Sequence, residues 1–393
     1  MFATSTIHIN RKALENNLQL IKNYLGPNVT LSSVIKGNAY GHGIEVFVPL
    51  AEECGINHFS VFNADEAFRA HKASVQNSTI MIMGMIENQD LRWAIKNDIE
   101  FYVFDFDRLS AALEIAQELE KPAKIHVEVE TGMNRTGFNN PQLTKVIEIL
   151  KNNKELYSLE GLCTHYAGAE SVANHARVKT QIRRYRSAYK KVVSHNLIPK
   201  KRHTACSAAA LSYPETIMDM ARIGIMQYGF WPSIETFINF IGKKENKKDP
   251  LERVISWKSK VMNTKNVKTG EFIGYGTSYI ARNDMKIATV PVGYAHGYSR
   301  SLSFQGRVLI HGQRVDVIGI VNMNLLIARI TDVPQTQKGD EVVMIGKQED
   351  SEITVASFGD FSNQLNYELL TRLPMDIPRV VKLNPEDIDR NAE

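Results

Sequence analysis

A lysine at position 36 lies between an extended apolar segment and a glycine-rich turn. Residues 30–35 read Thr-Leu-Ser-Ser-Val-Ile, and residues 36–43 read Lys-Gly-Asn-Ala-Tyr-Gly-His-Gly. Glycines here let the backbone approach a ligand closely, so the pattern predicts an amine at the mouth of a sheet. A lysine that is partly removed from water has a lowered pKa, which suits Schiff-base chemistry. Taken alone, Lys36 is better explained as an ordinary surface lysine after a strand.

Other side chains capable of chemistry also follow extended segments. They are Arg135 after residues 125–130, His165 after 159–164, Ser207 after 202–206, and Arg222 within 221–226. In a barrel of parallel strands, the C-terminal strand ends share one face, and that face carries the active site. We therefore expect these residues to gather around Lys36.

The elements that must position these residues alternate between extended and helical patterns. Asn10 can cap a helix whose apolar stripe contains Leu14, Leu18, Ile21 and Leu25. The extended segments are 30–35, 58–62, 79–83, 100–104, 125–130, 159–164, 202–206 and 221–226, and helical patterns such as 108–119 and 174–195 lie between most of them. About eight strands with intervening helices predict a TIM-type (β/α)8 barrel, with an open doubly wound sheet as the competing topology.

The pattern changes to mostly β after a charged loop near residues 242–250. The segments expected to be strands are 254–260, 285–292, 307–310, 315–322, 326–330 and 341–345, followed by a helical pattern at 357–373. We therefore predict an α/β barrel domain at residues 1–244 and a C-terminal β-strand-rich domain at residues 245–393.

Composition excludes several classes of protein. The 393 residues carry a net charge of only +4 without a basic run interleaved with aromatic residues, so no nucleic-acid partner is expected. The three cysteines are Cys54, Cys163 and Cys206. Their small number and wide separation favour a reducing compartment, and their spacing is not that of a metal site. No secretory signal or membrane-spanning apolar stretch is visible, so a cytoplasmic protein without a membrane partner is expected.

Six ordered segments resemble the alanine racemase family, whose members use pyridoxal 5'-phosphate (PLP) and combine an N-terminal barrel with a C-terminal β domain. They are residues 36–43, Thr-Gly-Met-Asn-Arg-Thr-Gly at 131–137, His-Thr-Ala-Cys-Ser-Ala-Ala at 203–209, Arg-Ile-Gly-Ile-Met-Gln-Tyr-Gly at 222–229, Gly-Tyr-Ala-His-Gly-Tyr-Ser-Arg at 293–300, and Asn-Met-Asn at 322–324. The likeness covers nearly the whole chain.

The resemblance implies a racemase that interconverts L- and D-alanine by a two-base mechanism and supplies D-alanine for peptidoglycan. Lys36 would bind PLP and handle the proton of the D enantiomer, while Tyr294 would handle that of the L enantiomer. In the family, the residues matching Tyr294 and Met323 reach the site from the partner subunit. A homodimer with shared active sites is therefore expected, with a small amino acid as substrate and no metal ion.

The resemblance also implies roles for the residues around the coenzyme. Arg222 would donate to the pyridine nitrogen, and His165 would neighbour Tyr294. The phosphate would be held by Ser207, Tyr40 and the backbone N–H groups of Gly224 and Ile225. Arg135 would donate to the phenolic oxygen and help bind substrate, and the backbone at Met323 would hold the substrate carboxylate. Because arginine stays protonated, Arg222 can only donate to an unprotonated ring nitrogen, which disfavours transamination.

Departures from the family pattern leave the substrate range open. They are Glu128 where a carbamylated lysine is common, Cys206 for asparagine, His296 and Asn324 for aspartates, and Met375 at an often aromatic position. The alternatives are a racemase of serine, lysine or arginine, a barrel-type PLP amino-acid decarboxylase, and a single-domain PLP-binding protein without enzymatic activity. Arg222 argues against the decarboxylase, because that family has a glutamate at the ring nitrogen. The β domain carrying Tyr294 argues against the single-domain protein.

Overall fold

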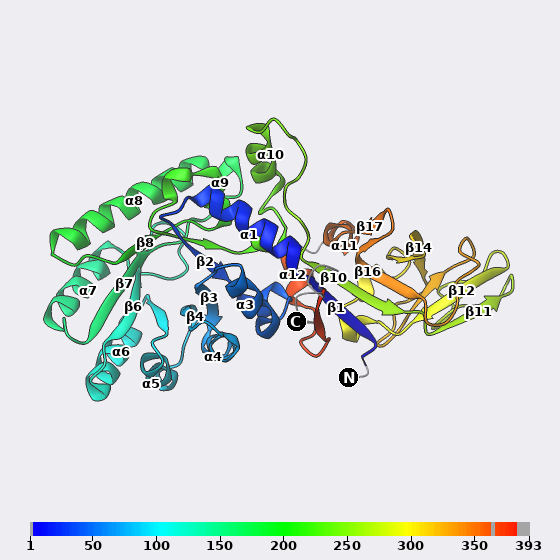
Figure 1. The fold of residues 1–393 in the computed structure, drawn as a ribbon, viewed down its shortest axis with the longest axis horizontal. Helices are drawn as coiled ribbons and strands as arrows, with labels where there is room; N and C mark the ends of the chain where they lie inside the picture. Colours follow the sequence, from blue (N-terminus) through cyan, green and yellow to red (C-terminus); the bar gives the residue numbers. More distant parts are fainter. Residues whose placement is uncertain (1–2, 363–365, 383–393) are drawn as a thin grey trace, which may run out of the picture. The chain divides into compact units, whose positions relative to one another are not determined.

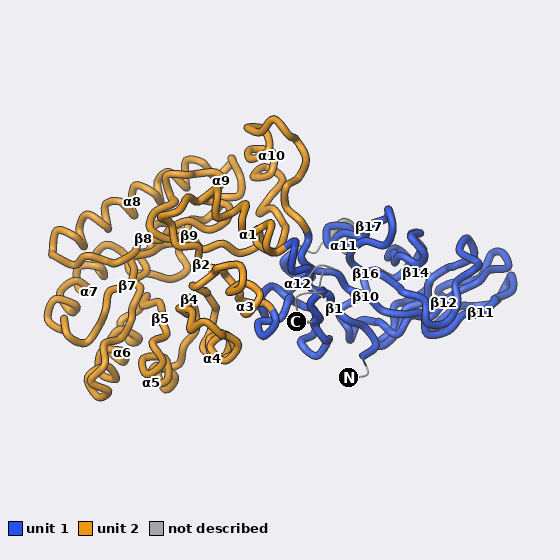
Figure 2. Tube along the Cα trace, in the orientation of Figure 1, with its two compact units in different colours: residues 1–13, 37–46, 253–393 blue, residues 14–36, 47–252 orange. Residues whose placement is uncertain are grey.

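The computed structural model describes residues 3–362 and 366–382, and its strands form two sheets (Figure 1). The chain forms two compact units (Figure 2). The barrel unit consists of Leu14–Lys36 and Phe47–Glu252, and the β unit consists of Met1–Ala13, Gly37–Val46 and Arg253–Glu393.

The barrel unit contains an eight-stranded parallel sheet. Its strands are β2 (Thr30–Val34), β3 (His58–Asn63), β4 (Thr79–Met85), β5 (Glu100–Val103), β6 (Ala123–Glu128), β7 (Tyr157–Cys163), β8 (Lys201–His203) and β9 (Met220–Ile223), in the order β8-β7-β6-β5-β4-β3-β2-β9. The two end strands, β8 and β9, meet just after β8 ends. The Arg222 N–H donates to the Ala205 carbonyl at 3.0 Å, and Cys206 and Arg222 form an isolated parallel β-bridge. This near-closed circle confirms the predicted barrel and is not an open doubly wound sheet.

Helices follow most of the barrel strands. They are α1 (Arg11–Leu25), α2 (Lys36–Tyr40), α3 (Ile44–Glu53), α4 (Ala64–Ala73), α5 (Asn88–Lys96), α6 (Phe106–Leu119), α7 (Asn140–Asn152), α8 (His175–Ser194), α9 (Ser207–Ser212) and α10 (Ile234–Gly242). Short 3₁₀ turns are η1 (Val172–Asn174), η2 (Pro214–Thr216) and η3 (Ile225–Tyr228). Asn10 caps α1 as expected, since the Ala13 N–H donates to its Oδ1 at 3.1 Å. The predicted apolar stripe of α1 is buried.

The β unit contains the second, ten-stranded sheet. Its strands are β1 (Ser5–Asn10), β10 (Ile255–Lys260), β11 (Asn263–Val267), β12 (Met285–Val290), β13 (Arg307–Ile310), β14 (Gln313–Ile318), β15 (Leu326–Arg329), β16 (Glu341–Gln348), β17 (Ser351–Ile353) and β18 (Arg379–Lys382). Its 3₁₀ turns are η4 (Tyr294–His296) and η5 (Arg300–Leu302), and its late helices are α11 (Val355–Ser362) and α12 (Asn366–Thr371). Part of the predicted helix at 357–373 lies outside the described residues.

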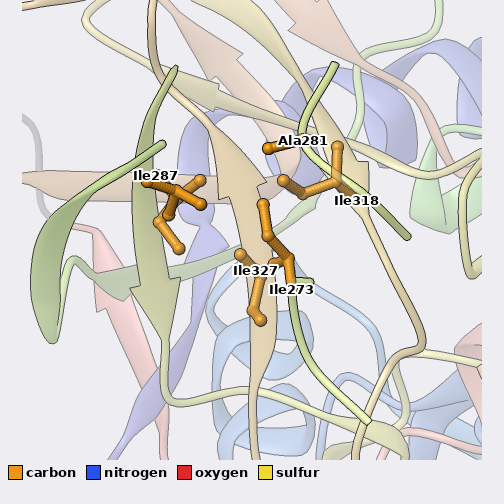
Figure 3. Close-up of a cluster of buried hydrophobic side chains, with 6 residues drawn as sticks. Ile273, Ala281, Ile287, Ile318 and Ile327 are labelled. Atoms are coloured by element: carbon orange, nitrogen blue, oxygen red, sulfur yellow. The ribbon is translucent and has the colours of Figure 1, made fainter. Parts of the chain in front are cut away.

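One apolar cluster stabilises the β11-β12-β15-β14 part of this sheet (Figure 3). Ile287 on β12, Ile327 on β15 and Ile318 on β14 pack with residues of the loop between β11 and β12. Burying each isoleucine contributes about 1.5–3 kcal/mol. The cluster therefore anchors that long loop to the sheet.

The N-terminal segment differs from the sequence-based expectation. Strand β1 pairs antiparallel with β10 and parallel with β18, so it belongs to the β unit's sheet. Ile7 and Ile9 are fully buried, which fits an alternating strand, but local periodicity does not reveal which distant strands it joins. Residues 37–46 also cluster with the β unit. The division into domains 1–244 and 245–393 stays a prediction, and the compact units group the chain differently. Across the described ranges, no helix has the length and apolarity needed to cross a membrane.

Candidate active site

Lys36 begins a left-handed turn directly after the second strand. The φ angles are 62° at Gly37, 55° at Asn38, 53° at Ala39 and 51° at Tyr40. A left-handed residue other than glycine costs roughly 1–2 kcal/mol, so this turn stores strain. The Gly41 N–H donates to the Gly37 carbonyl at 3.0 Å and helps to hold it. Backbone strain of this kind clusters at functional sites. Here the strained residues come directly after Lys36, which the sequence analysis singles out.

The surroundings of the Lys36 amine favour its neutral form. The side chain keeps access to solvent, yet burial by the surrounding barrel is the largest cause that lowers its pKa. The positive charges of Arg135 and Arg222 lower the pKa further, against the opposing effects of Glu66 and Cys206. A lysine with a lowered pKa is available as a nucleophile or base at neutral pH.

Arg222 is buried at the C-terminal end of β9. Its Nη1 donates to His203 Nδ1 at 2.8 Å and to the His203 carbonyl at 2.6 Å, and its Nη2 donates to the Thr164 carbonyl at 2.9 Å. These contacts engage three of the five N–H groups of a guanidinium. These hydrogen bonds therefore fix the side chain. The other two N–H groups of the guanidinium take no part in them.

His165 lies beside the same cationic groups. Burial lowers its pKa to about 3, and the charges of Arg222, Arg135 and Lys36 contribute in that order. The imidazole is therefore neutral at pH 7, and one of its nitrogens can accept a hydrogen bond. Arg135 and His165 also line one small cleft with Glu128, Thr136 and Thr164.

Glu128 places a carboxylate at the end of β6. Burial raises its pKa, while a hydrogen bond from Thr136 and the charge of Arg135 oppose that rise. Its Oε2 atom is buried and, among the described residues, has no hydrogen-bond partner. An acceptor is therefore present in the cleft that Arg135 lines.

Ser207, Gly224 and Ile225 meet at the strand ends of β8 and β9. The Gly224 N–H donates to Ser207 Oγ at 3.0 Å, and all three residues are buried. The predicted strand 221–226 is shorter than expected, since β9 ends at Ile223 and η3 begins at Ile225. This junction of hydroxyl and backbone N–H groups can bind an anion.

Three of the predicted site residues lie in the β unit. Tyr40 is buried, and its ring centroid is 5.9 Å from that of Tyr367. Tyr294 and Met323 lie side by side, because the Tyr294 N–H donates to the Asn322 carbonyl and the Ala295 N–H donates to the Met323 carbonyl, each at 3.0 Å. Tyr294 is 40% exposed and Met323 is 55% exposed.

Glycine at 293 makes the pairing of these two segments possible. A Cβ there would lie 2.1 Å from the Asn322 carbonyl oxygen, closer than any side chain tolerates. The structure thus gathers Lys36, Arg135, His165 and Arg222 in one unit and presents Tyr294 with Met323 in the other.

The residues at the barrel mouth fit an anionic coenzyme. The charges of Arg222 and Arg135 lower the pKa of the His165 imidazole, so positive charge converges beside it, and Lys36 adds to that charge when it is protonated. The buried Ser207 hydroxyl and the Gly224 backbone add hydrogen-bonding groups. Phosphate and phenolate oxygens, such as those of PLP, would balance this charge.

Comparison with known proteins agrees with this geometry. Residues 9–232 match the model of the alanine racemase N-terminal domain, and residues 254–381 match that of the alanine racemase C-terminal domain. The chain belongs to the alanine racemase family. A relative is the alanine racemase of Leptospira interrogans, 34% identical over 378 residues that cover 96% of each chain.

Solved structures of alanine racemases share the fold. That from Clostridium difficile has a TM-score of 0.89 at 30% identity and covers 98% of this chain and 97% of its own. That from Bartonella henselae, which has covalently bound pyridoxal phosphate, has a TM-score of 0.81 at 24% identity, covering 97% of this chain and all of its own. The resemblance inferred from sequence and the predicted barrel plus β domain are both confirmed.

Sequence reasoning missed a group of polar residues inside the barrel: His58, Glu100 and His126. They are almost completely buried, and they link to Arg222 through His203. The signal available in the sequence was a polar residue at the inner position of an otherwise apolar strand, as in Ile-His-Val at 125–127. The segment 203–209 was noted for Ser207, not for His203.

Proposed function

We propose that this protein is a PLP-dependent racemase that interconverts L- and D-alanine and so supplies D-alanine for peptidoglycan. The observation that carries the proposal is the convergence of Lys36, Arg135 and Arg222 around neutral His165 at the barrel mouth. Family membership over nearly the whole chain supports it. Bound PLP supplies an electron sink that makes the α-proton of an amino acid removable.

Lys36 holds the coenzyme covalently and moves the α-proton on one face of the substrate. Its lowered pKa makes the unprotonated amine easier to form than in an ordinary lysine, which both roles need. In this proposal, it returns or removes the proton of the D enantiomer.

Tyr294 moves the proton on the opposite face. A phenol has an ordinary pKa near 10 and is a poor base at neutral pH, so it needs a relay. His165, neutral and able to accept a hydrogen bond, is suited to that task. We place Tyr294 and Met323 of the partner subunit at the site, which makes the homodimer the active form. The exposure of both side chains in the single chain supports that placement.

Arg222 orients the ring and limits how far electrons are drawn into it. It donates N–H groups and does not give up a proton, so the ring nitrogen receives a hydrogen bond and not a proton. Electron withdrawal is then weaker, which favours return of the proton to Cα over transamination. The same property argues against the decarboxylase alternative, whose family has a glutamate in that place.

The remaining residues bind the anionic groups of coenzyme and substrate. Ser207, Tyr40 and the backbone N–H groups of Gly224 and Ile225 hold the phosphate. Arg135 donates to the phenolic oxygen and helps to bind the substrate carboxylate, together with the backbone at Met323. The buried Ser207–Gly224 contact supports the phosphate assignment.

Chiral chromatography tests this function. The purified protein, loaded with PLP, is incubated separately with a panel of L-amino acids, and each product is resolved into enantiomers. We expect equal amounts of D- and L-alanine at equilibrium, with slower conversion of larger residues. Faster conversion of serine, lysine or arginine would favour the broader racemase, and released CO₂ would favour a decarboxylase. Within the described residues, Cys163 and Cys206 form no disulfide bond, which supports the cytoplasmic location in this proposal.

A further inference from the structure

A chain of buried polar side chains runs through the interior of the barrel to Arg222. We call it the barrel column and define it as Ser32, His58, Glu100, His126 and His203, all at most 5% exposed. Each residue comes from a different strand: β2, β3, β5, β6 and β8 respectively. The column therefore depends on the closed barrel and not on any local segment.

The contacts of the column are continuous. Arg222 Nη1 lies 2.8 Å from His203 Nδ1, His203 Nε2 lies 2.8 Å from His126 Nδ1, and His126 Nε2 lies 2.8 Å from Glu100 Oε2. His58 approaches the same Glu100 oxygen through Nε2 at 3.3 Å, and its Nδ1 lies 2.9 Å from Ser32 Oγ. Both ring nitrogens of each of these three histidines are thus engaged.

The two ends of the column dictate where its protons lie. Arg222 only donates hydrogen bonds, so His203 Nδ1 must accept and its proton must be on Nε2. His203 Nε2–H then donates to His126 Nδ1, which leaves the His126 proton on Nε2 pointing at Glu100. An ionised carboxylate only accepts hydrogen bonds, so Glu100 accepts the one from His126 Nε2–H. Every proton position between Arg222 and Glu100 is then assigned. Protonating either imidazole would place two donors face to face.

The barrel backbone is shaped to allow this contact. A Cβ at Gly161 on β7 would lie 2.2 Å from His126 Nδ1 and 2.7 Å from His203 Nε2, so any side chain there would separate the two rings. A register shift between Ile125 and His126 sets Gly161 opposite His126. Bulges of this kind re-aim side chains next to active sites.

The electrostatics agree with the proton order derived from geometry. Burial lowers the pKa of His203 well below its usual value, and His126 and Arg222 lower it further. Burial would raise the pKa of Glu100, but the hydrogen bonds from His126 and His58 outweigh it and lower that pKa. Other groups that face the column are Tyr102, Cys163 and Lys201.

We propose that Glu100 is a positioning residue for Arg222: through His126 and His203 it fixes both imidazoles as neutral Nε2–H tautomers and balances the guanidinium charge inside the barrel. The inference about tautomers stands on the protein alone, and its consequence for the reaction rests on the proposed function. Glu100 touches neither coenzyme nor substrate in this proposal.

The charge of Glu100 has a defined effect on Arg222. The carboxylate polarises each imidazole in turn and makes His203 Nδ1 a stronger acceptor. Arg222 shares more of its Nη1 proton with that acceptor, so its remaining N–H groups become weaker donors. Without the charge, those groups would draw more electron density from the ring nitrogen, and side transamination would increase.

The first test observes the tautomers directly. The full-length PLP-loaded protein, labelled with ¹⁵N-histidine, is studied by NMR between about pH 6 and about pH 9, a range in which an ordinary histidine titrates. We expect both His126 and His203 to give Nε2–H signals, and the His203 signals not to change with pH. An Nδ1–H tautomer of either ring, or titration of His203 in this range, would overturn the proposal.

The second test compares two buried glutamates of the barrel. Glu100→Gln keeps an acceptor oxygen for both histidines and removes only the charge. Glu160→Gln is the matched control, because Glu160 is buried on β7, lies outside the column and contacts Lys200. We expect Glu100→Gln to raise the fraction of turnovers lost to transamination about threefold, because polarisation changes each hydrogen bond by roughly 10–30%. The control should leave that fraction unchanged.

A wedge variant keeps the proposal testable if Glu100→Gln does not fold. Gly161→Ala places a methyl group between the His126 and His203 rings while retaining every polar group of the column. We expect it to alter the ¹⁵N signals of both rings and to raise transamination to a similar degree. An unchanged transamination fraction in both variants would refute the role of Glu100. A wild-type protein that does not racemise alanine yet shows the predicted tautomers would refute the proposed function only.

Discussion

The barrel mouth and the surface around Tyr294 differ in how their side chains are held. Arg222 is buried and makes three hydrogen bonds to its neighbours, whereas Tyr294 is 40% exposed. The first group is positioned by the folded barrel itself. The second is exposed in the single chain, and in our proposal a second subunit covers it. The barrel mouth is preorganised, whereas in our proposal the Tyr294 surface completes a site only on assembly. Mutations in the two regions should therefore have different effects on turnover and stability.

The largest effect is expected at Lys36. Lys36→Ala removes both the covalent attachment and one of the two proton-transferring groups, so turnover should fall by at least about 10⁴-fold. Absorbance of the purified protein and borohydride reduction followed by peptide mapping measure the loss of the covalent adduct. An adduct found on another lysine would show that the barrel mouth has been misassigned.

A smaller but still severe effect is expected at Tyr294. Tyr294→Phe removes one proton-transferring hydroxyl and retains the ring, so turnover should fall by about 10²–10⁴-fold while PLP remains bound. Kinetics in both directions, with coenzyme absorbance as the control, measure this. Activity close to that of the wild type would remove Tyr294 from the mechanism and leave the β unit without a role in proton transfer.

Arg222→Glu tests how strongly the mouth is preorganised. It should raise transamination relative to racemisation, because a carboxyl group can protonate the ring nitrogen. It should also lower the free energy of unfolding by about 3–5 kcal/mol, since it breaks a buried charged network. Product analysis and urea denaturation measure the two effects. Arg222→Lys keeps the charge and is the control; an unchanged product ratio in Arg222→Glu would contradict the ring-nitrogen role.

The smallest effect concerns pH and His165. Its pKa in the folded protein is lowered to about 3, so the unfolded chain binds more protons between that value and about pH 6.5. Stability from this group is complete above about pH 6.5 and falls as the pH decreases, by at most about 1.4 kcal/mol per pH unit. Urea denaturation at about pH 7 and about pH 5 should show this slope in the wild type and a reduced slope in His165→Asn.

Much of the barrel follows from local sequence patterns. Eight strands with intervening helices, and Lys36, Arg135, His165 and Arg222 near the C-terminal strand ends, could all be predicted because each pattern is local and parallel strands share one polarity. The roles of these residues remain predictions. The structure adds that Lys36, Arg135 and Arg222 gather around the imidazole of His165.

Other features could not be read from local patterns. Strand β1 joins β10 and β18, partners that are more than 240 residues away, and periodicity carries no information about such pairing. The left-handed conformation of Ala39 and Tyr40 contradicts the preference of both residue types, because tertiary context overrides it. The barrel column was missed because isolated polar residues within apolar strands are ambiguous until the strands are arranged in a circle.

The pairing of β1 has a practical consequence for dissecting this protein genetically. A fragment that stops near residue 244 would retain β1 and lose both strands that flank it, so Ile7 and Ile9 would be left on an open, aggregation-prone edge. Shortening the chain at its beginning would in turn leave β10 and β18 without the strand between them. A single cut in the gene therefore does not separate the two units. To express either unit alone, the first ten residues must be removed from the barrel fragment and joined to the β-unit fragment.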